Sequence, residues 1–185
     1  MEQFPGYYAR ALRAIGQDLS DLLPESVTIE PEGDDFIARG MCNRTRLEAL
    51  ESSGWAGLRR LGAKLLNHHT PEADLDLVPF SRSYNAESID EIYKRGNQCR
   101  VGDGGMPEIY SLGERLRTIG KVIDSHLGRL VKIYKDLHHV VFEYCDTDIT
   151  PHKVELDNTE LYRLQSGYTT ERSDIETAAA NPDGV

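Results

Sequence analysis

The chain contains three related copies of one eight-residue stretch, the first of which is Leu12-Arg13-Ala14-Ile15-Gly16-Gln17-Asp18-Leu19. The other copies are Leu58-Arg59-Arg60-Leu61-Gly62-Ala63-Lys64-Leu65 and Leu116-Arg117-Thr118-Ile119-Gly120-Lys121-Val122-Ile123. In each copy apolar residues occupy positions i, i+3 and i+7, which share one face of an α-helix. A glycine recurs at one register, although a mid-helix glycine costs about 1 kcal/mol relative to alanine. We therefore expect Gly16, Gly62 and Gly120 each to lie where another backbone or a bulky side chain comes close.

The repeat continues beyond the helix. Residues 12–40 align with residues 116–144 without a gap, at an offset of 104 residues. In both copies the helix leads into an alternating strand, a polar turn and a second strand. The middle copy is less regular, and we expect its two strands at Asp74–Leu77 and near Phe80–Tyr84. The strands expected in the outer copies are Val27–Ile29 and Phe36–Arg39, then Leu130–Tyr134 and Val140–Tyr144.

These patterns predict an α+β protein made of three α-β-β-α-like repeats, which share a mainly antiparallel sheet covered by helices. We expect one domain over residues 1–168, with units at about 4–53, 54–100 and 109–168. Each unit closes with a helix whose apolar residues are spaced i, i+3. Residues 169–185 have almost no large apolar side chains and are predicted to form a disordered acidic tail. The closing pairs are Leu47 and Leu50, Ile89 and Ile92, and Leu161 and Leu164.

Composition restricts the classes of function. The formal net charge is −10 and the isoelectric point is near 5.0, which argues against binding to nucleic acid or to anionic membranes. No apolar run approaches the roughly 20 residues that span a bilayer. The first residues have neither a basic segment nor an apolar segment typical of a signal peptide, so we expect a cytoplasmic protein. Cys42, Cys99 and Cys145 show no metal-binding or disulfide spacing.

One group of residues could carry chemistry. In the last unit His139, Cys145, Asp146 and His152 could approach one another near the hairpin ends, and imidazole with thiolate or carboxylate suits zinc. Cys145 could also act as a nucleophile with His152 or His139 as its base. No spacing motif supports either arrangement, and solvated histidines with an inert strand cysteine are the favoured interpretation. No cofactor is predicted, and zinc is kept as the alternative.

Charge placement gives the most informative signal. Residues 1–35 hold eight acidic and two basic side chains, a balance of −6, whereas residues 111–145 hold four acidic and six basic side chains, a balance of +2. Opposite charge on related units is explained either by incidental variation of the surface, which is the more common case, or by the complementarity that fixes the register between protein surfaces. We therefore predict a non-enzymatic protein-interaction, assembly or small regulatory protein, with a protein partner that includes a second copy as one option. A metal- or thiol-dependent enzyme is the alternative. The predicted interaction residues are Arg115, Arg117, Lys132, Lys135, Glu30, Glu32, Asp34 and Asp35.

Overall fold

A computed structural model of the chain describes residues 4–20, 22, 24–49, 51, 76–98 and 112–166. The described helices and strands run in the order α-β-β-β-α twice, and residues 44–49 add a helical segment after β2. The first group is α1 Tyr7–Ser20, β1 Ser26–Glu32, β2 Asp35–Asn43, β3 Leu77–Tyr84 and α3 Ala86–Gln98. The second group is α4 Leu112–Ser125, β4 Arg129–Lys135, β5 His139–Cys145, β6 Pro151–Asp157 and α5 Asn158–Ser166.

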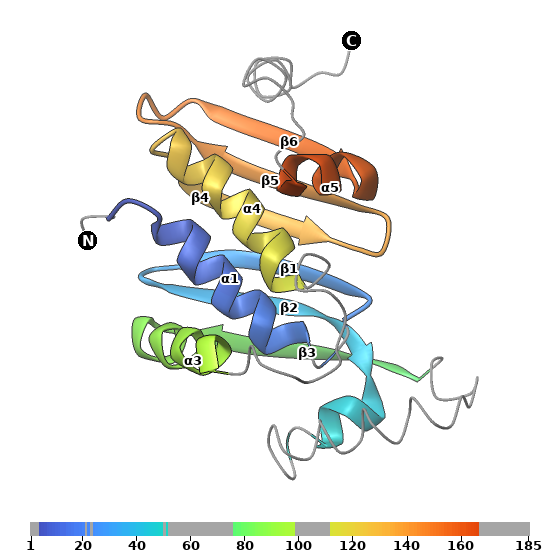
Figure 1. Ribbon diagram of the computed structural model, residues 1–185. Coiled ribbons are helices and arrows are strands. Elements are labelled where there is room, and N and C mark those ends of the chain that lie inside the picture. Colours follow the sequence, from blue (N-terminus) through green and yellow to red (C-terminus); the bar gives the residue numbers. More distant parts are fainter. Residues whose placement is uncertain are drawn as a thin grey trace.

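The six strands form one antiparallel sheet in the order β3-β2-β1-β4-β5-β6. All four labelled helices lie on one face of this sheet, and the other face carries no labelled helix (Figure 1). The two groups meet at the centre, where β1 pairs with β4. The protein is therefore of the α+β class with an antiparallel sheet, as the sequence predicts.

The repeated apolar positions form the core between the helices and the sheet. Leu12, Ile15 and Leu19 of α1 are fully buried, and so are Leu116, Ile119 and Ile123 of α4. The two helices pack against each other over the centre of the sheet, α3 packs beside α1, and α5 packs beside α4. This layer buries one stripe of each helix, as the i, i+3, i+7 spacing requires.

The glycines of α1 and α4 mark the closest approach of the two helices. A Cβ atom on Gly16 would lie 2.6 Å from the Cα atom of Gly113, and one on Gly120 would lie 2.5 Å from the backbone nitrogen of Ala9. The prediction of a close backbone approach is confirmed at these two positions. Gly62 lies outside the described residues.

The prediction of two separate strands in the middle copy is wrong, although the strand expected near Phe80–Tyr84 is present. Leu77 and Phe80–Tyr84 belong to a single strand, β3, which pairs with β2 continuously from Asn43 with Leu77 to Phe36 with Tyr84. Pro79 does not interrupt it, because a strand with a neighbour on one side can place a residue without an N–H group toward its free edge. The predicted helix of the middle copy, most of residues 54–75, and the predicted tail at residues 169–185 lie outside the described residues.

Among the described residues, no helix has both the length and the apolar composition needed to cross a membrane.

Candidate interaction surface

Opposite charges of the two groups meet on the surface of the sheet, within one chain. Because β1 and β4 are neighbours in the sheet, Lys132 Nζ lies 3.5 Å from Glu30 Oε1. Arg39 on β2 lies at the same distance from the other oxygen of Glu30. Lys132 also pairs in register with Glu143 on β5, and Glu143 pairs with Lys153 on β6. The bare face of the sheet therefore carries a row of alternating charges that neutralise one another.

Lys135 differs from this row because its side chain is buried. Its Nζ atom donates a hydrogen bond to the backbone oxygen of Asp136 at 2.9 Å. Burial, together with the positive charge of Arg115, lowers the pKa of Lys135 to about 8. Lys135 is accordingly part of the protein interior, although the charge pattern alone suggests a surface residue.

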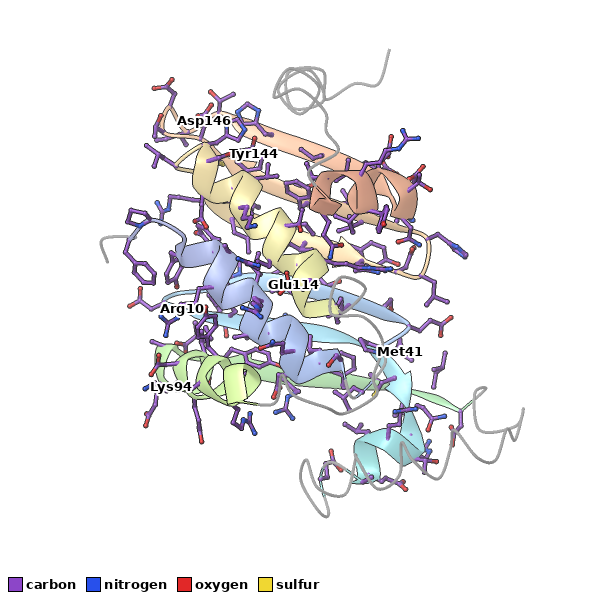
Figure 2. The ribbon with its side chains drawn as sticks, in the orientation of Figure 1. Arg10, Met41, Lys94, Glu114, Tyr144 and Asp146 are labelled. Carbon is purple, nitrogen blue, oxygen red and sulfur yellow. The ribbon has the colours of Figure 1, made fainter. Side chains whose placement is uncertain are left out.

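Two arginines of the helices, Arg13 and Arg117, also have partners within the chain, whereas Arg115 of α4 is half-buried and acts on Lys135 through its charge. The recurrent Arg13 is buried, and its Nε atom lies 3.0 Å from Glu114 Oε1 on α4. Arg117 lies 3.2 Å from the other oxygen of Glu114 (labelled in Figure 2). This carboxylate therefore joins α1 to α4, and Arg117 is held against its own helix rather than left for a partner.

The remaining predicted acids are free on the surface. Glu32, Asp34 and Asp35 are exposed at the β1–β2 turn, and Asp148 is exposed at the β5–β6 turn. None of these four carboxylates forms an ion pair with another described residue. Strands β1 and β5 run in the same direction, because each is antiparallel to β4. Both turns consequently lie at the same end of the sheet (Figure 1).

We call this region the hairpin end, and it consists of residues 32–35, 126–128 and 146–150. Residues 126–128 belong to it because they connect α4 to the first residue of β4, which lies at this end of the sheet.

The structure brings together only two of the four predicted metal or catalytic residues. His152 Nε2 lies 2.8 Å from Asp146 Oδ2, and this hydrogen bond is the main cause that lowers the pKa of Asp146. His139 starts β5 while Cys145 ends it, so these two lie at opposite ends of the strand. His139 instead contacts Asp136, with 3.1 Å between Nδ1 and Oδ1.

Cys145 does not face His152 either. Tyr144 is buried on the helix-covered face and pairs in register with His152. Its neighbour Cys145 therefore points to the opposite face, because successive side chains alternate along a strand. In the described part of the chain, no three His, Cys, Asp or Glu side chains gather closely enough to hold a metal ion. Cys42 is buried, which raises the pKa of its thiol, and Cys99 lies outside the described residues.

An aromatic stack at the hairpin end has no signal in the sequence. The ring of Tyr144 is stacked with His126 at 5.6 Å and with His152 at 5.1 Å between ring centroids. Asp146, labelled beside Tyr144 in Figure 2, holds the adjoining turn by accepting hydrogen bonds from the backbone nitrogens of Asp148 and Thr150, both at 2.9 Å. The stack thus ties the connection after α4 to β5, β6 and their turn. Long-range pairing creates it, so local pattern cannot predict it.

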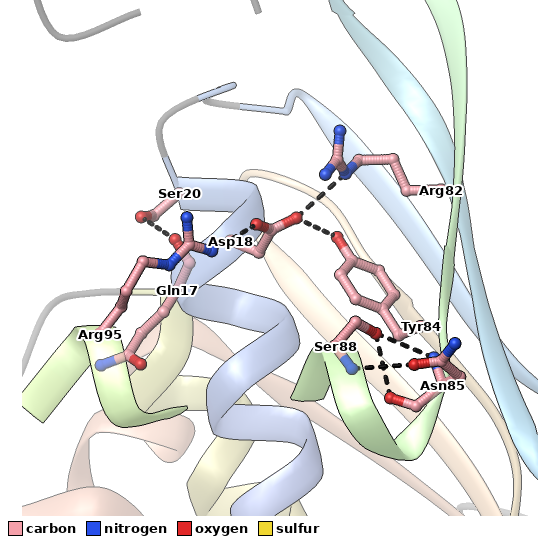
Figure 3. Close-up of polar contacts among 8 residues, drawn as sticks. All are labelled: Gln17, Asp18, Ser20, Arg82, Tyr84, Asn85, Ser88 and Arg95. Atoms are coloured by element: carbon pink, nitrogen blue, oxygen red, sulfur yellow. Dashed lines mark hydrogen bonds and ion pairs between the residues drawn. The ribbon is translucent and has the colours of Figure 1, made fainter. Parts of the chain in front are cut away.

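A second polar cluster joins α1 to β3 and α3 (Figure 3). Asp18 is 3% exposed, and its Oδ2 atom accepts hydrogen bonds from Tyr84 at 2.7 Å and from Arg82 at 3.0 Å. Arg95 of α3 lies 3.9 Å from the other oxygen. Burial, and then the charge of Asp18, raises the pKa of Tyr84 well above its usual range. In this cluster the buried carboxylate of Asp18 is paired with two arginines, and the cluster links α1 to β3 and α3.

No family model, curated protein or solved structure matches the chain.

Proposed function

We propose that this protein is a non-enzymatic interaction protein, of the assembly or small regulatory kind, which binds a protein partner at the hairpin end. One observation carries the proposal. Four of the eight charged side chains that the sequence predicts for interaction, Glu30, Arg117, Lys132 and Lys135, are paired or buried within the chain, whereas Glu32, Asp34 and Asp35 are exposed and form no ion pair with a described residue. Unpaired surface charge that faces outward is available to steer and orient a partner.

The enzymatic alternative finds less support in the geometry. A thiol nucleophile needs a base within hydrogen-bond reach. The thiol of Cys145 lies on the other face of the sheet from His152, and His139 lies at the far end of the strand. His152 and Asp146 form a pair, but this pair anchors a turn and a stack of rings.

We further propose that the two α-β-β-β-α groups are copies of one repeated unit. Support comes from equivalent contacts, because the approach of Gly16 to Gly113 corresponds to the approach of Gly120 to Ala9 at the offset of 104 residues. A second copy of the chain is one form of the proposed partner, since β3 and β6 each have a neighbouring strand on one side within the described sheet.

The test compares three versions of the protein, each immobilised on a resin and incubated with extracts of the cells that make the protein. The first is wild type, the second carries Glu32→Lys, Asp34→Lys and Asp35→Lys, and the third carries the same charge change elsewhere. Exposed Glu48, Glu87 and Glu91 changed to lysine provide this control. We expect quantitative mass spectrometry to find a protein that wild type and control retain in stoichiometric amount and that the hairpin variant loses. Equal retention by all three proteins would refute the proposal, and sedimentation of the purified chain shows whether the partner is a second copy.

A further inference from the structure

Two large apolar side chains at the hairpin end are exposed and have an unusual backbone. Leu127 is 74% exposed and Ile149 is 80% exposed. Their φ angles are 50° and 63°, and among the described residues they are the non-glycine residues with positive φ. L-residues with bulky side chains are uncommon in this left-handed region, and a β-branched residue such as isoleucine is a clear outlier there. Both positions therefore combine an unfavourable backbone with no burial of the side chain.

Capping of α4 does not account for Leu127. Its backbone nitrogen donates to the oxygen of Asp124 at 3.1 Å, and the nitrogen of Gly128 donates to the oxygen of Ile123 at 2.9 Å. This is a Schellman-type helix end, whose left-handed residue is usually glycine. The glycine stands one residue later, where a Cβ atom would lie 2.8 Å from the ring of Tyr144. Packing explains Gly128, but nothing in the fold explains a leucine at the cap.

The turn that contains Ile149 leads to the same conclusion. The nitrogen of Ile149 donates to the oxygen of Asp146 at 3.0 Å, and the nitrogen of Asp146 donates to the oxygen of Thr150 at 3.1 Å. Hairpin turns of this kind normally place glycine at the left-handed position. The β1–β2 turn of this chain does so with Gly33, whose φ is 64°. An exposed isoleucine in the corresponding conformation contributes nothing that a glycine would not provide for folding.

The two side chains are nevertheless held in fixed relation to each other. Leu127 adjoins His126, which stacks on Tyr144, and Tyr144 stacks on His152. His152 binds Asp146, which holds the turn carrying Ile149. Leu127 precedes β4 and Ile149 precedes β6, and these two strands lie about 10 Å apart with β5 between them, given a strand spacing of about 4.8 Å. Such rigid display of apolar groups is typical of interface anchors.

We propose that Leu127 and Ile149 are the paired apolar anchors of a docking surface whose occupant is a protein segment carrying both basic and apolar side chains. The proposal rests on the function proposed above and names its partner chemistry. The basic component follows from charge, since Asp148 adjoins Ile149 and Glu32, Asp34 and Asp35 lie at the same end of the sheet. A net charge of −10 opposes an anionic membrane as the occupant.

The experiment uses full-length protein to select binders from a library of random peptides. We expect the selected peptides to be enriched in lysine or arginine together with leucine, isoleucine or aromatic residues. The affinity of one such peptide is then measured for wild type, for Leu127→Gly with Ile149→Gly, and for Leu137→Ser. Leu137 is a matched control, because it is an exposed leucine at the opposite end of the sheet.

The double glycine variant should bind the peptide at least tenfold more weakly. It should also unfold at a higher denaturant concentration, because glycine adopts a positive φ angle without the steric strain of leucine or isoleucine. The Leu137→Ser variant should bind as wild type does. Loss of binding with a raised unfolding midpoint cannot come from misfolding, so the test separates docking from a structural role. Peptides that are not basic, or affinity that is unchanged in the double variant, would overturn the inference.

Two further outcomes are decisive. If binding depends on Glu32, Asp34 and Asp35 but not on the two apolar residues, the proposed function stands and this inference fails. If the library yields no binder, this inference fails, whereas the proposed function is decided by the retention experiment with the hairpin variant. Vesicles of phosphatidylcholine, with and without phosphatidylserine, are the membrane arm, and binding to either through Leu127 and Ile149 would overturn a protein occupant.

Discussion

At the scale of single residues, Lys135 is the clearest case of a charge in an unfavourable place. Its side chain is buried. The negative charge of neighbouring Asp136 favours the charged form of Lys135, whereas burial and the positive charge of Arg115 disfavour it. The pKa of about 8 is below the ordinary value of 10.5, so the folded protein holds this proton less tightly than the unfolded chain does. The charged form of Lys135 is therefore a source of instability at neutral pH.

Lys135→Met should stabilise the protein near pH 7 by about 1–3 kcal/mol, since methionine keeps the apolar stem and removes the buried charge. Between pH 8 and 10.5 the unfolded wild type binds more protons than the folded wild type, so wild-type stability rises with pH in this window. The advantage of the variant should consequently shrink toward pH 10. Urea unfolding of both proteins at several pH values measures this. A variant that is less stable at pH 7 would show that the ammonium group and its hydrogen bond to Asp136 stabilise the fold.

The sequence predicts individual buried residues well where they follow a period. The positions i, i+3 and i+7 of both outer copies are buried, and the recurring glycine is a contact point. Alternation places Lys135 on the same face of β4 as buried Ile133, but a lysine is rarely buried, so its residue type indicates the surface instead. The exposed left-handed residues Leu127 and Ile149 also give no signal, since their type is the opposite of what such positions normally contain.

At the scale of elements, the crossing of α1 and α4 depends on two positions without a side chain. Residues near Gly16 of α1 contact the start of α4, and residues near Gly120 of α4 contact the start of α1. At the latter contact Asp124 accepts hydrogen bonds from the backbone nitrogens of Tyr8 and Ala9, at 3.1 and 2.9 Å. The end of α4 thus caps the first turn of α1, where a carboxylate is favoured by the helix dipole.

Gly120→Ala tests whether this crossing is as close as the structure indicates. Helix propensity alone would stabilise the variant by about 1 kcal/mol. A Cβ atom at Gly120 would, however, lie 2.5 Å from the nitrogen of Ala9, and backbone atoms cannot move aside cheaply. We expect net destabilisation of about 1–3 kcal/mol, measured by the shift of the denaturant midpoint. Lys121→Ala, on the exposed side of the same helix, is the control and should change stability by less than about 0.5 kcal/mol. A raised midpoint for Gly120→Ala would refute the close crossing.

Element boundaries follow from the sequence within a few residues wherever one helix or strand is read by itself. The expected strand Val140–Tyr144 lies within β5, and Val27–Ile29 lies within β1. Elements whose identity depends on a partner were harder. Asp74–Leu77 and Phe80–Tyr84 read as two strands because they imitate the spacing of a hairpin, yet pairing with β2 makes Leu77–Tyr84 continuous. The hydrogen bond between Tyr84 and Asp18 could not be predicted either, because 66 residues separate the two in the sequence.

At the scale of the whole molecule, the repeat that we propose for the two groups would relate them by an approximate two-fold rotation through the centre of the sheet. Ile29 pairs with Ile133, and these residues are themselves equivalent at the offset of 104 residues. The same relation exchanges the two glycine contacts of α1 and α4. The sequence predicts three repeat units, whereas the described elements form two groups, which are joined by the antiparallel pairing of β1 with β4. A two-fold axis of this kind is what a homodimer of one group would have.

This symmetry predicts that a fragment of residues 109–168 forms a homodimer, whereas a fragment of residues 1–98 does so much more weakly. In the first fragment, Arg117 of one copy would take the place of Arg13 opposite Glu114 of the other, preserving the buried ion pair. In the second, Arg13 would face Arg10, since Arg10 is the equivalent of Glu114.

Backbone packing permits either dimer. In a dimer of the first fragment Gly120 would approach Gly113 of the other copy, and in a dimer of the second Gly16 would approach Ala9. The equivalent contacts in the intact chain are Gly120 with Ala9 and Gly16 with Gly113. The charges therefore decide, because Arg13 and Arg10 would repel each other whereas Arg117 and Glu114 would attract each other, and a like-charge contact is unfavourable relative to an opposite pair. Sedimentation equilibrium with circular dichroism over a range of concentrations would measure both fragments, with Glu114→Arg in the first as the control that should abolish its dimer. A folded monomer of residues 109–168, or a tighter dimer of residues 1–98, would contradict the two-fold relation as the organising principle of the fold.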